Sequence, residues 1–399
     1  MSWIRSDFKK YLAQTSPDPL MFHPVRGEGV YFFDQSGKKY LDLISGISVS
    51  ALGQGHSRVK KAVEAQLEKY THTMVYGEFI LTPQLELARL VLSTLPKSLD
   101  NIYFVNSGSE AVEGAIKLAF KYTGRRELIA CKNAYHGSTT GALSLMSDEY
   151  YSGGYKPLLP NVQYIDFNSV DSLVAITENT AAVFVETVQG EAGYLPADKE
   201  FMRALRNRCS ETGCLLVLDE IQSGMGRTGK FWAFEHYGIV PDILLTAKGF
   251  GGGLPLGAFI ARREVMSALS DKPILGHITT FGGNPLSCAA SIATIEEILE
   301  RELHLGAIAK GEMFKARLRE YGLDKVSGMG LMLGVNCGDF SVSQRMVKRC
   351  LEKGLITDWF LYETGKLRIC PPLIISEQQI HEACEIIGEA YTEIKKSDH

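Results

Sequence analysis

The spacing of hydrophobic residues changes twice along the chain. Near the start, two short apolar runs at 30–33 and 39–43 flank the turn residues 34–37, a pattern that predicts a β-hairpin. Residues 57–70 then place apolar side chains at intervals of three and four, which predicts an amphipathic helix.

From about residue 80, helical patterns alternate with short runs that are apolar throughout. We predict helices at 85–96, 109–124 and 200–213, and strands at 101–105, 127–133, 181–187, 214–220 and 242–247. Strands without polar alternation are typical of a parallel sheet that lies between two layers of helices. The expected fold is therefore α/β, with a mainly parallel central sheet flanked by helices.

The pattern changes again after a long helix that begins at Asn284 and Pro285. Apolar runs at 328–340, 351–360 and 366–376 predict a small α+β unit, and a final helix covers about 377–396. We expect an N-terminal segment, 1–55, that joins the small domain, a large domain at 56–285, and a C-terminal small domain at 286–399.

The composition narrows the class of protein. Hydrophobic residues make up 45% and charged residues 22%, and the net charge is −4 without a long basic block, which argues against a nucleic-acid partner. No apolar stretch approaches the ~18 residues of a membrane span, and the first residues lack the apolar core of a signal peptide. The eight cysteines include no CxxC pair and predict reduced, buried thiols. We expect a cytoplasmic protein.

One stretch, "LLVLDEIQSGMGRTGKF" at 215–231, holds two conflicting signals. Its second half is close to the nucleotide-binding pattern GxxxxGK, but that loop needs Ser or Thr after the lysine, and here Phe231 follows. The strand also ends five residues before the first glycine. What remains is Asp219 at the carboxyl end of a buried strand, where open α/β sheets bind ligands; a structural salt bridge is the alternative interpretation.

Three further segments suggest chemistry. The turn 106–109 between a strand and a helix suits a phosphate, although Ser107 or Ser109 as an ordinary helix cap explains it too. Lys248 follows a buried strand and precedes a run of glycines, so its amine is either shielded and nucleophilic or lies in a loose surface loop. Tyr135 could stack on a flat ligand, whereas we interpret His136 as a hydrogen-bonded core residue, because no metal-ligand cluster accompanies it.

A phosphate cradle, an aromatic face, a strand-end acid and a shielded lysine together predict a site for pyridoxal 5′-phosphate. At this point the sequence resembles the class III (omega) aminotransferases of fold type I, from about residue 27 to the C-terminal helix. The resemblance is carried by the segments "NSGSEAVEGAIKLA", "AYHGST", "VETVQGEAGY", "LDEIQSGMGRTGKFWA", "DILLTAKGFGGGLPLGA", "TTFGGNPLSCAAS" and "LRICPPL".

The resemblance implies a role for each matching residue. Lys248 matches the lysine that holds the cofactor covalently, and Asp219 the acid that bonds the pyridine nitrogen. The other matches are Gly108 and Ser109 at the phosphate, Tyr135 and Ile221 on the two ring faces, Gln222 near the ring hydroxyl, Thr280 at the phosphate of the neighbouring subunit, and Glu191 with Arg368 at the substrate end. The resemblance therefore also implies a homodimer, and the large domain becomes the cofactor-binding domain.

The segments "LISGISVSALGQGH" and "VQGEAGY" are most similar to ornithine and N-acylornithine aminotransferases. Two positions depart from that pattern: Ser138 stands where an arginine usually binds the substrate carboxylate, and Ile47 stands where ornithine aminotransferases have Tyr. We expect ornithine or N-acylornithine as donor and 2-oxoglutarate as acceptor, with 4-aminobutyrate, diaminobutyrate or polyamines as alternative donors. Two alternative functions from other classes of protein are an aminomutase and a non-catalytic nucleotide-binding module.

Overall fold

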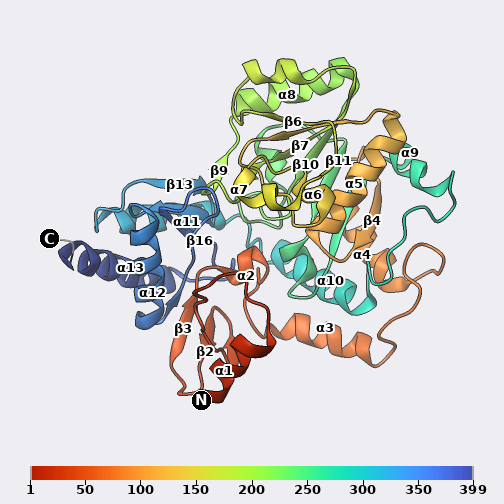
Figure 1. Cartoon of the computed structure of the whole chain (residues 1–399). Coiled ribbons are helices and arrows are strands. Elements are labelled where there is room, and N and C mark those ends of the chain that lie inside the picture. Colours follow the sequence, from red (N-terminus) through yellow and green to blue (C-terminus); the bar gives the residue numbers. More distant parts are fainter. Residues whose placement is uncertain (1, 398–399) are drawn as a thin grey trace.

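The computed structural model describes residues 2–397. Its centre is a seven-stranded sheet with the order β4-β12-β11-β10-β7-β5-β6 (Figure 1). The strands are β4 (Asn101–Val105), β5 (Glu127–Cys131), β6 (Val162–Ile165), β7 (Thr180–Glu186), β10 (Leu215–Asp219), β11 (Ile243–Thr246) and β12 (Gly257–Ala261). All are parallel except β12, which is antiparallel to β11 and β4. The predicted mainly parallel sheet is confirmed. Two of its strands were not predicted: β12, which follows the glycine run, and the edge strand β6, which is partly exposed.

Helices cover both faces of this sheet. Successive strand residues point to opposite faces, so Ala182 and Leu215 pack against helix α5 (Gly108–Thr123), while Val183 and Leu216 belong to the core on the other face. That second face is covered by helices α4 (Thr82–Ser93), α8 (Lys199–Thr212) and α10 (Pro285–Glu300). Strands buried on both faces explain why their sequences are apolar throughout.

The two ends of the chain meet in a second, smaller sheet. Strands β1 (Arg26–Glu28), β2 (Tyr31–Phe33) and β3 (Lys39–Asp42) pair with β15 (Leu355–Ile356) from the C-terminal part. The predicted hairpin is confirmed, because β2 and β3 are antiparallel neighbours. A third sheet holds β13 (Val326–Met329), β14 (Met332–Asn336) and β16 (Lys366–Ile369), and helices α11 (Ala307–Arg319), α12 (Phe340–Lys353) and α13 (Glu377–Ser397) pack beside these two sheets.

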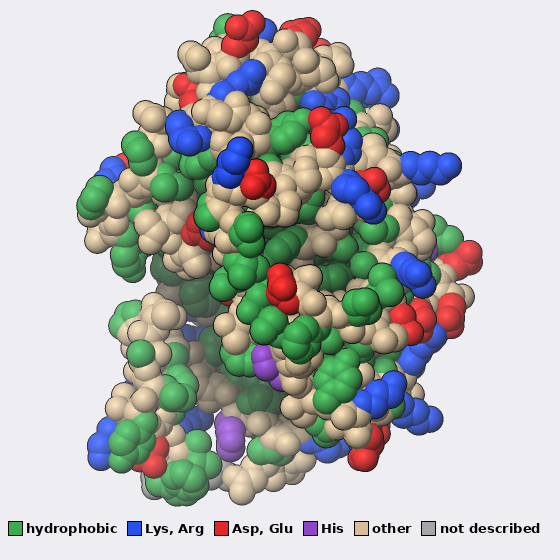
Figure 2. All heavy atoms as spheres, turned by 90° about the vertical axis from the view of Figure 1, so that its right-hand side faces the viewer, with side chains coloured by type: hydrophobic (Ala, Val, Ile, Leu, Met, Phe, Trp, Pro, Cys, Tyr) green, Lys and Arg blue, Asp and Glu red, His purple; other side chains and the backbone are tan. Residues whose placement is uncertain are grey.

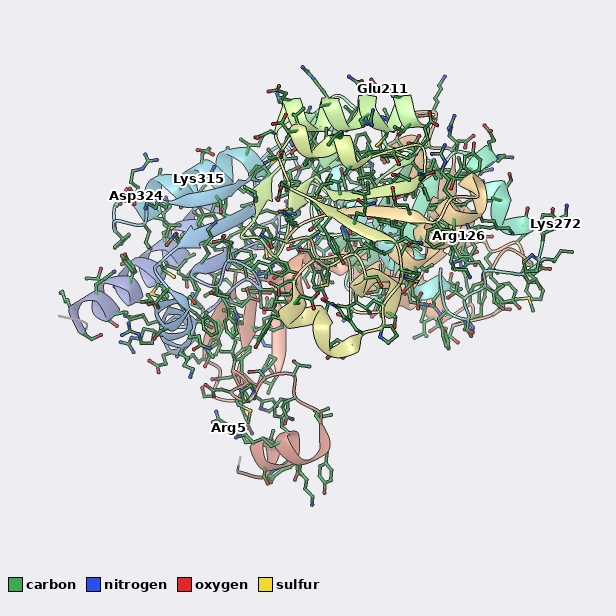
Figure 3. The ribbon with its side chains drawn as sticks, turned by 45° about the horizontal axis from the view of Figure 1, so that its top comes forward. Arg5, Arg126, Glu211, Lys272, Lys315 and Asp324 are labelled. Carbon is green, nitrogen blue, oxygen red and sulfur yellow. The ribbon has the colours of Figure 1, made fainter. Side chains whose placement is uncertain are left out.

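The remaining elements are short or peripheral: α1 (Ser2–Tyr11), α2 (Ser45–Ser48), α3 (Ser57–Leu67), α6 (Thr140–Leu143), α7 (Glu149–Ser152), α9 (Arg263–Met266), β8 (Val188–Gln189) and β9 (Leu195–Pro196). Helix α1, which carries Arg5, stands off from the body, and charged side chains such as Lys272 and Glu211 point outward (Figure 3). Within residues 2–397, no helix combines the length and the apolar character needed to cross a membrane.

The glycine-rich loop 224–230 packs inward instead of opening to a ligand. Gly226 and Gly229 have φ of +91° and +99°, and a Cβ on them would lie 2.7 Å from His304 and 2.4 Å from Ile308. Arg227 is buried, its carbonyl accepts a hydrogen bond from the Leu331 amide, and its side chain donates to the Pro371 carbonyl. The loop therefore joins the large sheet to the C-terminal part, which agrees with the rejection of a nucleotide loop.

Candidate active site

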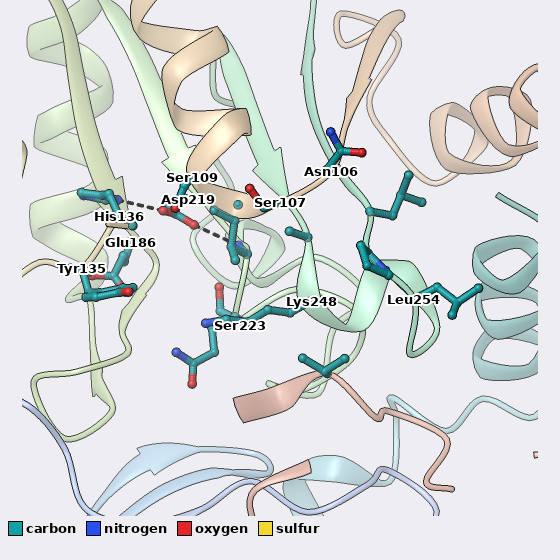
Figure 4. A pocket seen from close by; sticks show the side chains of 18 of the residues that line it. Asn106, Ser107, Ser109, Tyr135, His136, Glu186, Asp219, Ser223, Lys248 and Leu254 are labelled. Atoms are coloured by element: carbon teal, nitrogen blue, oxygen red, sulfur yellow. Dashed lines mark hydrogen bonds and ion pairs between the residues drawn. The ribbon is translucent and has the colours of Figure 1, made fainter. Parts of the chain in front are cut away.

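Three ionisable side chains meet at the carboxyl edge of the central sheet. In the parallel register, Asp219 at the end of β10 lies opposite Glu186 at the end of β7 and opposite Leu245 of β11. Lys248 follows β11 by two residues. All three ionisable residues line one cavity of about 410 Å³, together with the start of α5 and the segment 135–137 (Figure 4).

Asp219 is held by a buried histidine. Its Oδ2 lies 2.8 Å from Nδ1 of His136, and its Oδ1 accepts a hydrogen bond from the Ile221 amide at 3.0 Å. Burial alone would lower the pKa of His136, but the hydrogen bond to Asp219 and the charge of that carboxylate raise it above its usual value. His136 is thus hydrogen-bonded in the core, as predicted, and one Asp219 oxygen is fixed in place.

Glu186 is a second buried acid that the sequence interpretation missed. Burial raises its pKa to about 7, against the opposing effect of His136. Its oxygens accept hydrogen bonds from the amides of Tyr135, at 3.0 Å, and Gly190, at 2.8 Å. The signal was present, since Glu186 ends a buried strand just as Asp219 does.

Lys248 is enclosed at the cavity wall. It has a φ of +50°, a region of backbone space that few residues other than glycine adopt. Burial lowers the pKa of its ammonium, which disfavours the charged form, and the negative charges of Glu191 and Asp219 oppose that shift. Of the two interpretations from the sequence, the structure supports the shielded lysine over the loose surface loop.

The start of α5 forms a closely packed cradle. Ser107 caps the helix, and its Oγ accepts a hydrogen bond from the Glu110 amide at 3.2 Å. The first amides of a helix have no partner within it, and Gly108 and Ser109 line the cavity. A Cβ on Gly108 would lie 2.8 Å from Cδ1 of Ile221, so glycine is needed for this approach. The turn therefore caps helix α5 through Ser107 and also faces the cavity with Gly108 and Ser109, so the two interpretations from the sequence are compatible.

The other residues predicted around a ring lie in the same cavity. Tyr135, Ile221 and Gln222 all line it. The Tyr135 hydroxyl lies 3.1 Å from Oγ of Ser138, and Oε1 of Gln222 accepts a hydrogen bond from the Tyr194 hydroxyl at 2.7 Å. Gln222 therefore connects the cavity to the group of residues around Arg368.

Arg368 on β16 is buried among acceptors. Its Nη2 donates to both carboxylate oxygens of Glu191, at 3.0 and 2.9 Å, and its Nε donates to Asp358 at 2.8 Å. Its Nη1 lies 3.3 Å from both the Tyr194 hydroxyl and Oε1 of Gln222. Burial alone would lower the pKa of Arg368, but the acidic groups around it raise this pKa well above its ordinary value. The predicted pair of Glu191 and Arg368 is in contact.

Glu191 and Arg368 do not line this cavity themselves but adjoin it through Gln222. Thr280 does not line it either. It is exposed, in a surface segment beside a hollow that is also lined by Asn106 and Glu110. Its assignment to the site of a neighbouring subunit stays a prediction.

Comparison with known proteins identifies the family. Residues 12–391 match the family "Aminotransferase class-III". The acetylornithine aminotransferase of Archaeoglobus fulgidus is 40% identical over 388 residues, which cover 97% of this chain and 100% of that protein. The succinylornithine transaminase/acetylornithine aminotransferase of Pseudomonas aeruginosa is 37% identical over 98% of this chain and 97% of its own length. The chain belongs to the class-III aminotransferases.

Solved structures agree with this assignment. The ornithine aminotransferase of Toxoplasma gondii superposes with a TM-score of 0.91 at 28% identity, over 99% of this chain and 95% of that one. This class-III aminotransferase therefore has the fold-type-I architecture predicted from its sequence, and its activity is pyridoxal-phosphate-dependent transamination.

The cavity of the aminotransferase fits a phosphorylated pyridine aldehyde. It offers a partly shielded amine at Lys248 and a buried carboxylate at Asp219. It also offers helix-start amides at a glycine whose Cβ would collide with Ile221. The sequence interpretation did not find Tyr194 and Asp358, because their involvement depends on contacts between segments that are distant in the chain.

Proposed function

We propose that this aminotransferase transfers the ω-amino group of an N-acylornithine or ornithine donor to 2-oxoglutarate. The observation that supports it most is that Gln222, which lines the cavity of Lys248 and Asp219, also contacts Arg368, the partner of Glu191. The cavity suits the cofactor, and the buried guanidinium next to it suits a substrate carboxylate.

The residues around the cavity would hold pyridoxal phosphate as follows. The amides of Gly108 and Ser109 would receive the phosphate, and Asp219, oriented by His136, would accept a hydrogen bond from the protonated pyridine nitrogen. Ile221 and Tyr135 pack on the two ring faces, and Gln222 lies near the ring hydroxyl. Bound in this way, the cofactor acts as an electron sink that stabilises negative charge on the substrate carbon.

Lys248 has two tasks in this proposal. Its Nζ holds the cofactor at rest, and once the amino substrate has replaced it, the freed amine removes the proton from the carbon that bears the amino group. Burial lowers the pKa of Lys248 and so favours the neutral amine that can accept this proton.

We further infer a homodimer. Exposed hydrophobic side chains occur in two segments joined by the ring contact of His72 with Phe281 at 4.7 Å. They are Met74, Phe79, Ile80, Leu85, Ile274, Leu275, Ile278 and Phe281. Figure 2 shows hydrophobic side chains gathered over the middle of the face on this side of the molecule. A surface of this kind fits a subunit interface, and Thr280 within it would reach the phosphate of the neighbouring site.

The donor is proposed from the relatives. Those from A. fulgidus and P. aeruginosa are named for acetylornithine and succinylornithine. Ser138 counts against this donor, because it cannot supply the charge-assisted bond of an arginine to the substrate carboxylate, a contact worth roughly 1.5–3 kcal/mol. Other ω-amines are therefore tested beside it. Because all eight cysteines are buried free thiols, we also infer a cytoplasmic location.

A donor panel tests this proposal. Purified enzyme is assayed with 2-oxoglutarate and with N-acetylornithine, ornithine, 4-aminobutyrate, diaminobutyrate or putrescine, and kcat/KM is measured for each. We expect the highest kcat/KM for N-acetylornithine and no turnover when the keto acid is omitted. A higher kcat/KM for 4-aminobutyrate or putrescine would contradict the donor assignment, and turnover without a keto acid would indicate an aminomutase.

A further inference from the structure

Arg368 has a second acidic partner, Asp358, which binds a different nitrogen of the guanidinium from the one that binds Glu191. Oδ1 of Asp358 accepts a hydrogen bond from Nε of Arg368 at 2.8 Å, while Glu191 binds Nη2. Asp358 is partly shielded, with 22% of its side chain exposed. Burial raises the pKa of this carboxyl to about 6, although the positive charge of Arg368 acts in the other direction.

Asp358 and Arg368 are fixed to each other by the backbone as well. The Arg368 amide donates to the Asp358 carbonyl at 2.9 Å, and the neighbouring Trp359 forms a β-bridge with Leu367. The Trp359 carbonyl also lies 3.3 Å from Nη2. Asp358 therefore belongs to the same rigid β-structure as Arg368, whereas Glu191 follows β8 in a turn of the large domain.

The two carboxylates consequently differ in what they can do. Glu191 occupies Nη2, while Gln222 and Tyr194 contact Nη1, so Glu191 must give way if a substrate carboxylate is to bind both Nη groups. Asp358 holds Nε, the nitrogen nearest the backbone, which a substrate need not contact. An arginine held at Nε keeps its two Nη groups aimed in one direction after the other partner leaves.

We propose that Asp358 is a positioning residue for the acceptor: it fixes Arg368 through Nε so that both Nη groups face the carboxylate of the incoming keto acid. This inference rests on the proposed function, in which Arg368 binds that carboxylate. Asp358 contacts no substrate itself and takes no part in proton transfer at Lys248.

The experiment compares acceptors with and without a carboxylate. The holoenzyme and the variants Asp358→Ala, Asp358→Ser and Asp358→Asn are assayed with 2-oxoglutarate, pyruvate and butanal, and the donor half-reaction is followed separately by the absorbance of the cofactor. Asp358→Asn keeps an oxygen that can accept the Nε proton, whereas the serine hydroxyl is too short to reach it. Arg368→Ala serves as the control for the acceptor site.

We expect Asp358→Ala and Asp358→Ser to raise KM for both keto acids about tenfold or more, which is the loss typical of one charge-assisted hydrogen bond. KM for butanal and the donor half-reaction rate should stay within about twofold, and Asp358→Asn should restore most of the keto-acid KM. A purely structural role would impair all of these reactions together.

The outcomes separate the two proposals. If Arg368→Ala raises KM for the keto acids but the alanine and serine variants of Asp358 do not, the positioning role is wrong and the proposed function stands. Equal losses for butanal and the keto acids in the Asp358 variants would also overturn the positioning role. If Arg368→Ala itself fails to distinguish keto acids from butanal, the assignment of Arg368 as the carboxylate site is wrong, and the inference about Asp358 falls with it.

Discussion

Gly108 offers a direct test of how closely the phosphate cradle is packed. In Gly108→Ala, the added Cβ would lie 2.8 Å from Cδ1 and 3.0 Å from Cγ2 of Ile221, and Ile221 is the residue proposed to pack on the cofactor ring. Ile221 would have to move, and overpacking of this kind costs about 1–3 kcal/mol. If that cost falls on the bound state, the cofactor Kd rises by about 5- to 150-fold.

Titration of the apo-enzyme with pyridoxal phosphate, followed by cofactor absorbance, measures this Kd. Ile221→Ala removes every atom within 3.3 Å of the new Cβ, so Gly108→Ala should cost less in that background, with a coupling of about 1 kcal/mol. Gly154→Ala is the matched control, because its Cβ would meet nothing within 4 Å. An unchanged Kd in Gly108→Ala, or the same loss with and without Ile221, would refute the reasoning.

Four further predictions follow from the same geometry. Lys248→Ala should abolish transamination and the absorbance band of the lysine-bound cofactor; retention of both would remove Lys248 from its role. Asp219→Asn should keep the cofactor but lose most of kcat, and near-normal turnover would exclude Asp219 as the acid at the ring. Ile80, whose side chain is 92% exposed, lies in the proposed interface, so Ile80→Asp should give monomers in analytical ultracentrifugation; an unchanged dimer would place the interface elsewhere. Burial raises the pKa of Glu220 from 4.5 to about 8, so the folded state holds this proton more tightly than the unfolded state does. The free energy of unfolding should therefore fall as pH rises through that range, by at most about 5 kcal/mol. Glu220→Gln should flatten this pH dependence in denaturant unfolding, and an identical slope would contradict the prediction.

Local pattern was enough to predict most of the central sheet. Strands β4, β5, β7, β10 and β11 are apolar throughout because helices cover both of their faces, and the sequence shows this directly. Strand β12 was not predicted, because its five residues follow a glycine run and begin with glycine. The strand-end positions of Asp219 and Lys248 were predictable for the same reason, since carboxyl ends of parallel strands meet at one edge.

Partners that come from distant segments could not be predicted in this way. Asp358 follows a two-residue strand and carries no local sign of function, and its significance comes only from the Nε of Arg368. Tyr194 likewise gains its place through Gln222 and Arg368, far along the chain. Such contacts depend on how the C-terminal sheet docks on the large domain, which hydrophobic periodicity does not specify.

The loop 224–230 is a feature of this docking rather than of ligand binding. It leaves the strand that ends at Asp219, and through Arg227 it bonds to Leu331 and to Pro371, which lies three residues after Arg368. The two glycines that resemble a nucleotide loop are required because His304 and Ile308 pack where a Cβ would lie. The loop thus connects the strand of the proposed cofactor acid to the strand of the proposed carboxylate clamp. Because both connections are buried, the distance between Asp219 and Arg368 is set by packing within the core.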